Sequence, residues 1–251
     1  GYEWLTEKLH FSTLTVDVDA HSRSAMALGT QYWGVTVADM TAGYQIFANG
    51  GVYHKPATYY YVQDHNGSVI LDNRDGMENG ERVMREESAT IMNKLLHKPI
   101  YYANSTGGYL ADMPMEVFGK TGTTDDDYDL YFVGGTPFCV AGVWNGYTYS
   151  RELGDGSMSM RIWKTVMNYL YENYDWGDRN WILSDNVQQL AFCRSSGKLA
   201  GPSCFDTATG WYESGNAPGT CNGGSDHITG PSPSPSALPS AAPSVVPSVS
   251  P

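Results

Sequence analysis

The chain has 251 residues, with 15 Lys or Arg against 27 Asp or Glu, and a formal net charge of -12. This charge argues against nucleic-acid binding, which needs a basic surface to neutralise phosphates. A hydrophobic fraction of 41% predicts a packed core over most of the chain. No apolar run is long enough for a transmembrane helix, and no signal peptide is recognisable, which leaves open a targeting segment before Gly1.

Two helices and a hairpin are predicted between residues 36 and 97, after a short helix and a loop in residues 1–30. The first helix covers residues 36–49, because Thr36 and Asp39 form a capping-box pattern and apolar residues recur at helical spacing. A hairpin follows at residues 57–71, where Asn66-Gly67 separates two apolar runs. The second helix covers residues 86–97, and we expect Pro99 to end it.

Residues 116–145 predict a three-stranded antiparallel meander. We expect its strands at residues 116–124, 130–134 and 139–144, with an acidic turn at 125–129. The second and third strands are apolar almost throughout, and such strands are usually covered on both faces. A helix predicted at residues 158–171 is available to cover one of them.

The composition changes after about residue 181. We therefore divide the chain into a main domain at residues 1–180, a Cys-containing extension at 181–227 and a Pro/Ser-rich tail at 228–251. The tail cannot bury enough apolar surface to offset the entropy of ordering, so we expect it to be disordered.

The residues that carry chemistry are Gly-Lys-Thr-Gly-Thr-Thr at 119–124. Side chains alternate along a strand, so Lys120 and Gly122 are expected on one face and Thr121 and Thr123 on the other. A cation and hydroxyls at a sheet edge can hold a peptide carboxylate, and Gly122 lets a substrate backbone approach. Taken alone, these residues also fit an ordinary edge strand with a surface lysine.

Several ordered blocks resemble the transpeptidase domain of bifunctional (class A) penicillin-binding proteins. After Lys-Thr-Gly-Thr-Thr come Asp-Leu-Tyr-Phe-Val-Gly-Gly-Thr-Pro at 129–137 and Val-Ala-Gly-Val-Trp-Asn-Gly-Tyr at 140–147, which are similar to strands of that family in the same order. Residues 24–29 and 34–53 resemble the family's preceding segments. The stretch from Cys193 to His227 is similar to a C-terminal segment of some members.

This resemblance implies an α+β fold of the penicillin-binding transpeptidase (serine β-lactamase-like) type, an antiparallel sheet with packed helices, whose N-terminal part is missing. It implies that Lys120 is catalytic and that Thr121, Gly122 and Thr123 bind substrate, with an oxyanion donor from the backbone near Thr123. The implied partners are peptidoglycan stem peptides ending in D-alanyl-D-alanine, and β-lactams. No cofactor is implied.

The family attacks with the serine of a Ser-x-x-Lys motif, helped by a Ser-x-Asn motif. The Ser-x-x-Lys at residues 195–198 follows the Lys-Thr-Gly strand, whereas the family's order puts the nucleophile before it. We expect no Ser-x-Asn in the chain, both functional motifs before Gly1, and no acyl transfer by the chain alone. The parent is expected to be a cell-wall synthase anchored at the extracellular face of the bacterial cytoplasmic membrane, with a glycosyltransferase domain.

Two other functions stay open at this point. A D,D-carboxypeptidase or a β-lactamase-related serine hydrolase also has Lys-Thr-Gly. A non-catalytic wall-binding module would keep the sheet and lack the nucleophile. The sequence of the parent protein would discriminate between them, because a glycosyltransferase domain occurs only in the bifunctional class.

Cys193, Cys204 and Cys221 lie in a stretch poor in core residues, which suggests a covalent or metal staple. We expect a disulfide between two of them rather than a Cys₃His zinc site with His227, because the spacings do not fit the tight pairs of common zinc sites. No metal is therefore predicted. The acidic run at residues 125–127 is interpreted as a solvated turn.

Overall fold

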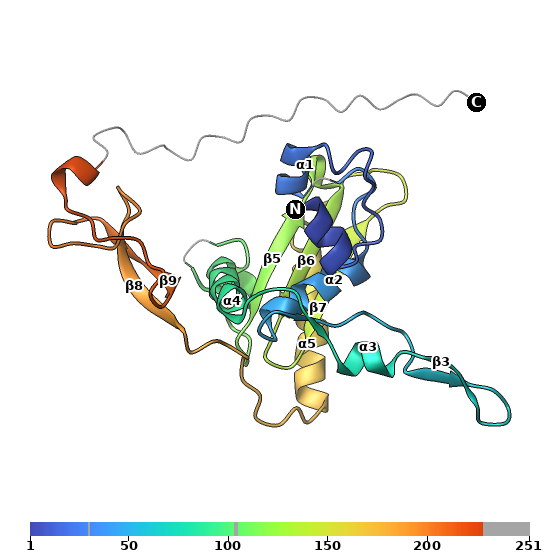
Figure 1. The fold of residues 1–251 in the computed structure, drawn as a ribbon. Coiled ribbons are helices and arrows are strands. Elements are labelled where there is room, and N and C mark those ends of the chain that lie inside the picture. Colours follow the sequence, from blue (N-terminus) through green and yellow to red (C-terminus); the bar gives the residue numbers. More distant parts are fainter. Residues whose placement is uncertain (30, 103–104, 228–251) are drawn as a thin grey trace. The chain divides into compact units, whose positions relative to one another are not determined.

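The computed structural model describes residues 1–29, 31–102 and 105–227. The described part of the chain divides into two compact units, one over residues 1–188 and one from residue 189 onward (Figure 1). The α-helices are α1 (Arg23–Leu28), α2 (Val37–Tyr44), α3 (Arg74–Glu78), α4 (Glu86–Tyr101) and α5 (Met158–Asn173). The strands are β1 (Val52–Tyr53), β2 (Tyr61–Gln63), β3 (Val69–Asp72), β4 (Glu81–Arg82), β5 (Phe118–Thr123), β6 (Asp129–Gly135), β7 (Val140–Gly146), β8 (Val187–Cys193) and β9 (Thr207–Glu213). Among the described residues, no helix is both long and apolar enough to cross a membrane.

The first helix begins where the sequence predicts. Thr36 is the N-cap of α2, and its hydroxyl accepts a hydrogen bond from the amide of Asp39 at 3.0 Å. The buried carboxylate of Asp39 also accepts from the amide and the hydroxyl of Ser12, at 3.0 and 2.7 Å. The start of the helix is therefore tied to the segment that precedes it. Beyond the helix, only glycine fits at Gly51, because its φ is +95° and a Cβ would lie 2.3 Å from the Met84 carbonyl oxygen.

The predicted hairpin is also present. β2 and β3 are antiparallel, with Tyr61 opposite Asp72. The carboxylate of Asp64 accepts hydrogen bonds from the amides of Asn66 and Ser68, at 2.8 and 2.9 Å, and so closes the turn. Such side-chain-to-backbone bonds are the reason that Asp is common at turns.

Helix α4 continues past the predicted stop. The expectation that Pro99 ends the helix is wrong, because α4 runs to Tyr101 with Pro99 inside it. Proline removes a backbone donor and strains the preceding turn, but here it lies in the last turn of the helix. The next residue, Ile100, is 1% exposed in the core, and the Pro99 carbonyl accepts a hydrogen bond from Gly107 at 2.7 Å. These contacts offset the cost of the proline.

Strands β5, β6 and β7 pair antiparallel in this order, which confirms the predicted meander. Helix α5 covers one face, where Trp163 is fully buried with its ring 5.2 Å from that of Phe132 and its N–H donating to the Ala141 carbonyl at 3.0 Å. Helix α2 packs on the other face. There Gly142 of β7 allows close approach, because a Cβ would lie 2.3 Å from the Thr41 hydroxyl oxygen. Both faces of the apolar strands are covered, as predicted.

The apolar side chains of the first unit gather into clusters around these layers. One cluster joins α5 and β6 to the segment after α4, and a second joins the N-terminal segment to α2. The buried members of the first are Ile100, Leu110, Met113, Met115, Val117, Phe132, Met160, Trp163 and Met167, and those of the second are Leu9, Phe11, Leu14, Ala42, Ile46 and Tyr53.

The first unit extends past the predicted domain boundary at residue 180. Ile182 forms a parallel bridge with Asn49, and the amide of Ser184 donates to the Thr90 hydroxyl at 2.8 Å. The second unit is built on the two-stranded sheet of β8 and β9. The predicted tail at residues 228–251 lies outside the described residues.

Candidate functional site

Strand β5 carries the Lys-Thr-Gly residues at the edge of the three-stranded sheet. Its first two residues, Phe118 and Gly119, are buried, whereas Lys120, Gly122 and Thr123 are exposed. The strand therefore leaves the core as it reaches the motif. Helix α4 packs beside the strand, and the interaction of the His97 and Phe118 rings places that contact at its buried start. The motif is therefore held by a paired strand and remains accessible.

The side chains of the motif alternate as predicted. Thr121 lies opposite Phe132 of β6, so Thr121 and Thr123 are on the face of the sheet that α5 covers. Lys120 and Gly122 are on the face that α2 covers. A Cβ added at Gly122 itself would come within 3.1 Å of the Tyr131 side chain. A larger residue would therefore press against β6.

The backbone of β5 turns two of its N–H groups toward the free edge. The amide of Thr124 donates to the Asp129 carbonyl at 3.1 Å, so the Thr124 N–H points toward β6. Because these directions alternate along an antiparallel strand, the N–H groups of Thr123 and Thr121 point away from β6. The Lys120 ammonium donates to the Thr121 carbonyl at 2.8 Å, which places this charge beside the same edge. The edge thus offers a donor pair: a backbone N–H from Thr123 and the Lys120 ammonium.

A strained acidic turn ends the strand. Asp126 and Asp127 have φ of 58° and 52°, in the left-handed region that Asp tolerates better than most residues. The Thr124 hydroxyl accepts from the Asp129 amide at 2.8 Å, and the Asp129 carboxylate accepts from the Trp144 ring N–H at 2.9 Å. Asp125 and Asp126 are exposed and Asp127 is half-buried, so the structure agrees with a largely solvated turn.

A wide cleft of about 1190 Å³ lies elsewhere on the first unit. It is lined by α2, by residues 54–57 and 136–140, and by residues 178–180. None of residues 120–123 lines it. The candidate site is therefore the open edge of β5 rather than this cleft.

Comparison with known proteins identifies the fold and the family of the segment that contains β5. Residues 14–132, which include the whole of β5, match the family model of the penicillin-binding protein transpeptidase domain. This segment of the chain belongs to that family. Penicillin-binding protein 1A of Clostridium tetani is 32% identical over 206 residues, which are 76% of this chain and 25% of the relative. Its counterpart from Clostridium acetobutylicum is 37% identical over 150 residues, 59% of this chain and 18% of the relative. The chain thus spans a quarter or less of the length of these two penicillin-binding proteins.

Solved penicillin-binding proteins share the fold. The crystal structure of penicillin-binding protein 1A from Haemophilus influenzae superposes with a TM-score of 0.65 at 20% identity, over 84% of this chain and 36% of that chain. The structure of PonA1 from Mycobacterium tuberculosis gives a TM-score of 0.54 at 21% identity, over 70% of this chain and 50% of that chain. The predicted penicillin-binding transpeptidase fold is confirmed.

Some described residues match the Ser-x-x-Lys and Ser-x-Asn motifs of penicillin-binding proteins in sequence. Their structural setting does not fit those motifs. Ser195 of the Ser-x-x-Lys match lies in a turn after β8, not at the start of a helix, and Lys198 is ion-paired with Asp226 at 2.8 Å. The expectation that Ser-x-Asn does not occur is wrong, because residues 184–186 and 214–216 both match it. Both follow the Lys-Thr-Gly strand. The Ser184 hydroxyl accepts from the Asn186 amide at 3.2 Å, which is a local turn bond.

The disulfide predicted for the second unit is not present in the part of that unit that the structure describes. Cys193, Cys204 and Cys221 all carry free thiols. Their sulfur atoms lie together with a ring nitrogen of His227, and the four atoms are all within 4.8 Å of one another. Hydrogen bonds from Ser196 lower the pKa of Cys193 to about 6, whereas burial raises the pKa of Cys204 to about 11. The spacing along the chain did not predict this convergence.

Proposed function

We propose that this chain supplies the substrate-binding strand of a peptidoglycan D,D-transpeptidase. The observation that carries the proposal is the free edge of β5, toward which the Thr123 N–H points and beside which the Lys120 ammonium lies, within the segment that matches the transpeptidase family. An extended peptide can add to such an edge through backbone hydrogen bonds, with side-chain groups providing specificity.

The proposed reaction is acyl transfer from a stem peptide. A serine hydroxyl attacks the carbonyl of the penultimate D-alanine and loses its proton to a base, and the peptide bond breaks to release D-alanine, which takes up a proton. The acyl-enzyme ester is then attacked by an amine of a neighbouring stem peptide. A new amide bond forms and the serine regains its proton. A β-lactam would acylate the same serine because it resembles the D-alanyl-D-alanine end.

Each motif residue has a separate part in this scheme. Lys120 supplies positive charge to the proton network and to the substrate carboxylate. The hydroxyls of Thr121 and Thr123 bind that carboxylate, and Gly122 leaves room for the peptide backbone. The outward N–H of Thr123 stabilises the oxyanion that develops during attack, a contribution of about 10²–10³ in rate for one donor.

The reacting serine is proposed to lie in a longer protein, of which this chain is one part. Support comes from the clostridial relative, of which the chain spans 25%. We propose that the longer protein is a bifunctional penicillin-binding protein with a glycosyltransferase domain, anchored at the outer face of the bacterial cytoplasmic membrane. The relatives named penicillin-binding protein 1A favour this choice.

Labelling with a fluorescent penicillin, read on a denaturing gel, tests the proposal. We expect the gene's full-length product to be labelled and the 251-residue chain alone to stay unlabelled. A labelled chain would place the nucleophile inside these residues and overturn that part of the proposal. A full-length product that takes up no label would favour the wall-binding module instead.

Two substitutions at one position test the oxyanion donor in the full-length product. Thr123→Pro removes the outward N–H without removing a bond to β6, which an edge strand tolerates. Thr123→Val keeps the N–H and removes only the hydroxyl. We expect the acylation rate to fall about 10²–10³-fold in Thr123→Pro and by a smaller factor in Thr123→Val. Equal rates in the two variants, with both folded by circular dichroism, would contradict the assignment.

A further inference from the structure

The ligand-type side chains of the second unit come from well-separated parts of its chain. Cys193 ends β8, Cys204 lies in the loop before β9, Cys221 follows β9, and His227 follows the short helical turn at Gly224–Asp226. Within the described residues, these three cysteines and the histidine form a group whose ligand atoms are close enough to hold a metal ion. We propose that these four side chains bind one structural Zn²⁺.

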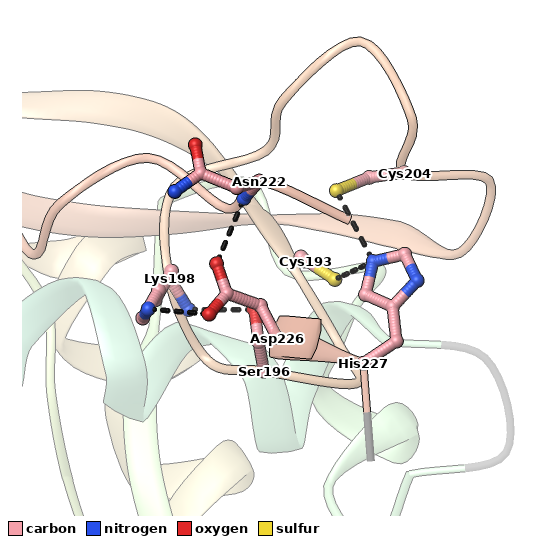
Figure 2. Close-up of polar contacts among 7 residues, drawn as sticks. All are labelled: Cys193, Ser196, Lys198, Cys204, Asn222, Asp226 and His227. Atoms are coloured by element: carbon pink, nitrogen blue, oxygen red, sulfur yellow. Dashed lines mark hydrogen bonds and ion pairs between the residues drawn. The ribbon is translucent and has the colours of Figure 1, made fainter. Parts of the chain in front are cut away.

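The distances agree with the edges of a tetrahedron. The Nε2 atom of His227 lies 3.4 Å from the Cys193 sulfur and 3.6 Å from the Cys204 sulfur (Figure 2). Around Zn²⁺, bonds of about 2.3 Å to sulfur and about 2.0 Å to nitrogen at tetrahedral angles place a sulfur and a nitrogen about 3.5 Å apart. The ring nitrogen is therefore already at the separation that a shared metal ion requires.

A disulfide accounts for this arrangement less well. It would join two sulfurs at about 2.0 Å and would leave the third cysteine and the histidine without a role. Here the histidine ring nitrogen points at two of the thiols rather than away from them (Figure 2). Three sulfurs and one imidazole nitrogen match a closed structural zinc site, and soft thiolate ligands favour Zn²⁺ over Mg²⁺ or Ca²⁺.

The segments that carry the ligands are fixed by bonds that do not involve a metal. Lys198 donates to the Asp226 carboxylate at 2.8 Å, and this carboxylate also accepts from the Asn222 amide at 2.8 Å (Figure 2). The Cys221 amide donates to the Leu199 carbonyl at 2.8 Å. The turns before Cys221 and before His227 are thus held against the segment that follows Cys193.

The size of the unit gives a reason for such a staple. Among its described hydrophobic residues, only Cys193 and Cys221 are buried, at 1% and 2% exposure. A unit this small with so little buried apolar surface rarely folds without disulfides, a metal or another constraint. Metal binding would supply folding free energy directly, because the site does not exist in the unfolded chain.

Metal analysis of the purified chain tests the proposal. The chain is prepared under reducing conditions and its zinc is measured by inductively coupled plasma mass spectrometry. We expect one zinc per chain, lost in Cys221→Ser and in His227→Asn. The matched controls are Cys139→Ser and His65→Asn, which alter residues outside the cluster and should keep the metal.

Measurements on the unaltered chain keep the proposal falsifiable if a variant fails to fold. Replacement of zinc by Co²⁺ should give a thiolate-to-metal charge-transfer band and tetrahedral visible bands. An organomercurial that titrates the thiols should release zinc into a colorimetric indicator. A chain that takes up neither zinc nor Co²⁺ while its thiols are reduced would overturn the proposal. So would Co²⁺ spectra of an octahedral site without thiolate ligands.

Discussion

The hydroxyl of Ser159 is the point where the start of α5 is held to the sheet. It is 2% exposed, and its oxygen lies 2.7 Å from the Leu130 carbonyl and 2.8 Å from the Asn145 side-chain oxygen. Ser159→Ala removes this hydroxyl and with it a hydrogen bond to the buried Leu130 carbonyl. Such a loss costs about 1–3 kcal/mol. For a chain of this size, that corresponds to a fall in Tm of about 2–12 °C.

Urea unfolding followed by tryptophan fluorescence measures this cost, because Trp163 lies one turn further along α5. The control is Ser150→Ala, which alters an exposed serine and should change the free energy of unfolding by less than about 0.5 kcal/mol. If Ser159→Ala and Ser150→Ala unfold at the same urea concentration, the hydroxyl does not anchor the helix and the reasoning fails.

Three further predictions concern the same unit. Trp163→Phe should lower the free energy of unfolding by about 1–3 kcal/mol, since it removes the donor to the Ala141 carbonyl; an unchanged urea midpoint would contradict this. Gly119→Ala should lower the free energy of unfolding by about 1–3 kcal/mol, because the added Cβ would lie 2.6 Å from the Phe132 ring. The control Gly154→Ala should cost far less, because nothing lies within 4 Å of a Cβ there. Equal Tm values for the two variants would refute the prediction. Burial lowers the pKa of His97 below 6.5. As the pH falls, this histidine is therefore protonated in the unfolded state before it is protonated in the folded state. The free energy of unfolding should then decrease as the pH drops below 6.5. His97→Gln should reduce that slope in urea titrations between pH 7 and 5, while His65→Gln should leave it unchanged.

The elements that could be predicted from the sequence are those defined by their own residues. Thr36 caps α2 by a bond to an amide three residues away, and Asp64 closes its turn by bonds to the next few residues. The meander likewise depends on apolar strands joined by short turns. In each case the atoms that stabilise the structure lie close together in the chain, so a local pattern contains the information.

The apolar stripe of α4 predicts its buried face only in part, since Ala89 and Leu96 are buried. Met92 and Leu95 fit an apolar stripe, yet they are 37% and 42% exposed, whereas Asn93 is fully buried. The Asn93 amide donates to the Phe47 carbonyl at 2.9 Å, so this polar residue of the buried face is paired with a group 46 residues away. A partner this distant cannot be identified from the residues of the helix itself.

The cysteine cluster shows the same limit for the site residues. Residue spacing argued for a disulfide, because it does not contain the tight pairs that bring two zinc ligands together along the chain. In the structure, residues far apart in the chain meet instead. Leu199 forms a parallel bridge with Thr220, and this brings the segment of Cys221 beside that of Cys193. The motif on β5, by contrast, is contiguous, and its face and edge positions follow from one strand.

The acidic turn after β5 has a consequence for self-association. An exposed strand edge is a template to which the strand of another copy can add. Parallel pairing of two β5 edges would bring their Asp125–Asp127 turns together, and the charges would repel each other in a chain whose net charge is -12. Antiparallel pairing would direct each turn toward the start of the other strand, where α4 is packed. The turn therefore discourages aggregation through this edge and leaves it open to a short peptide.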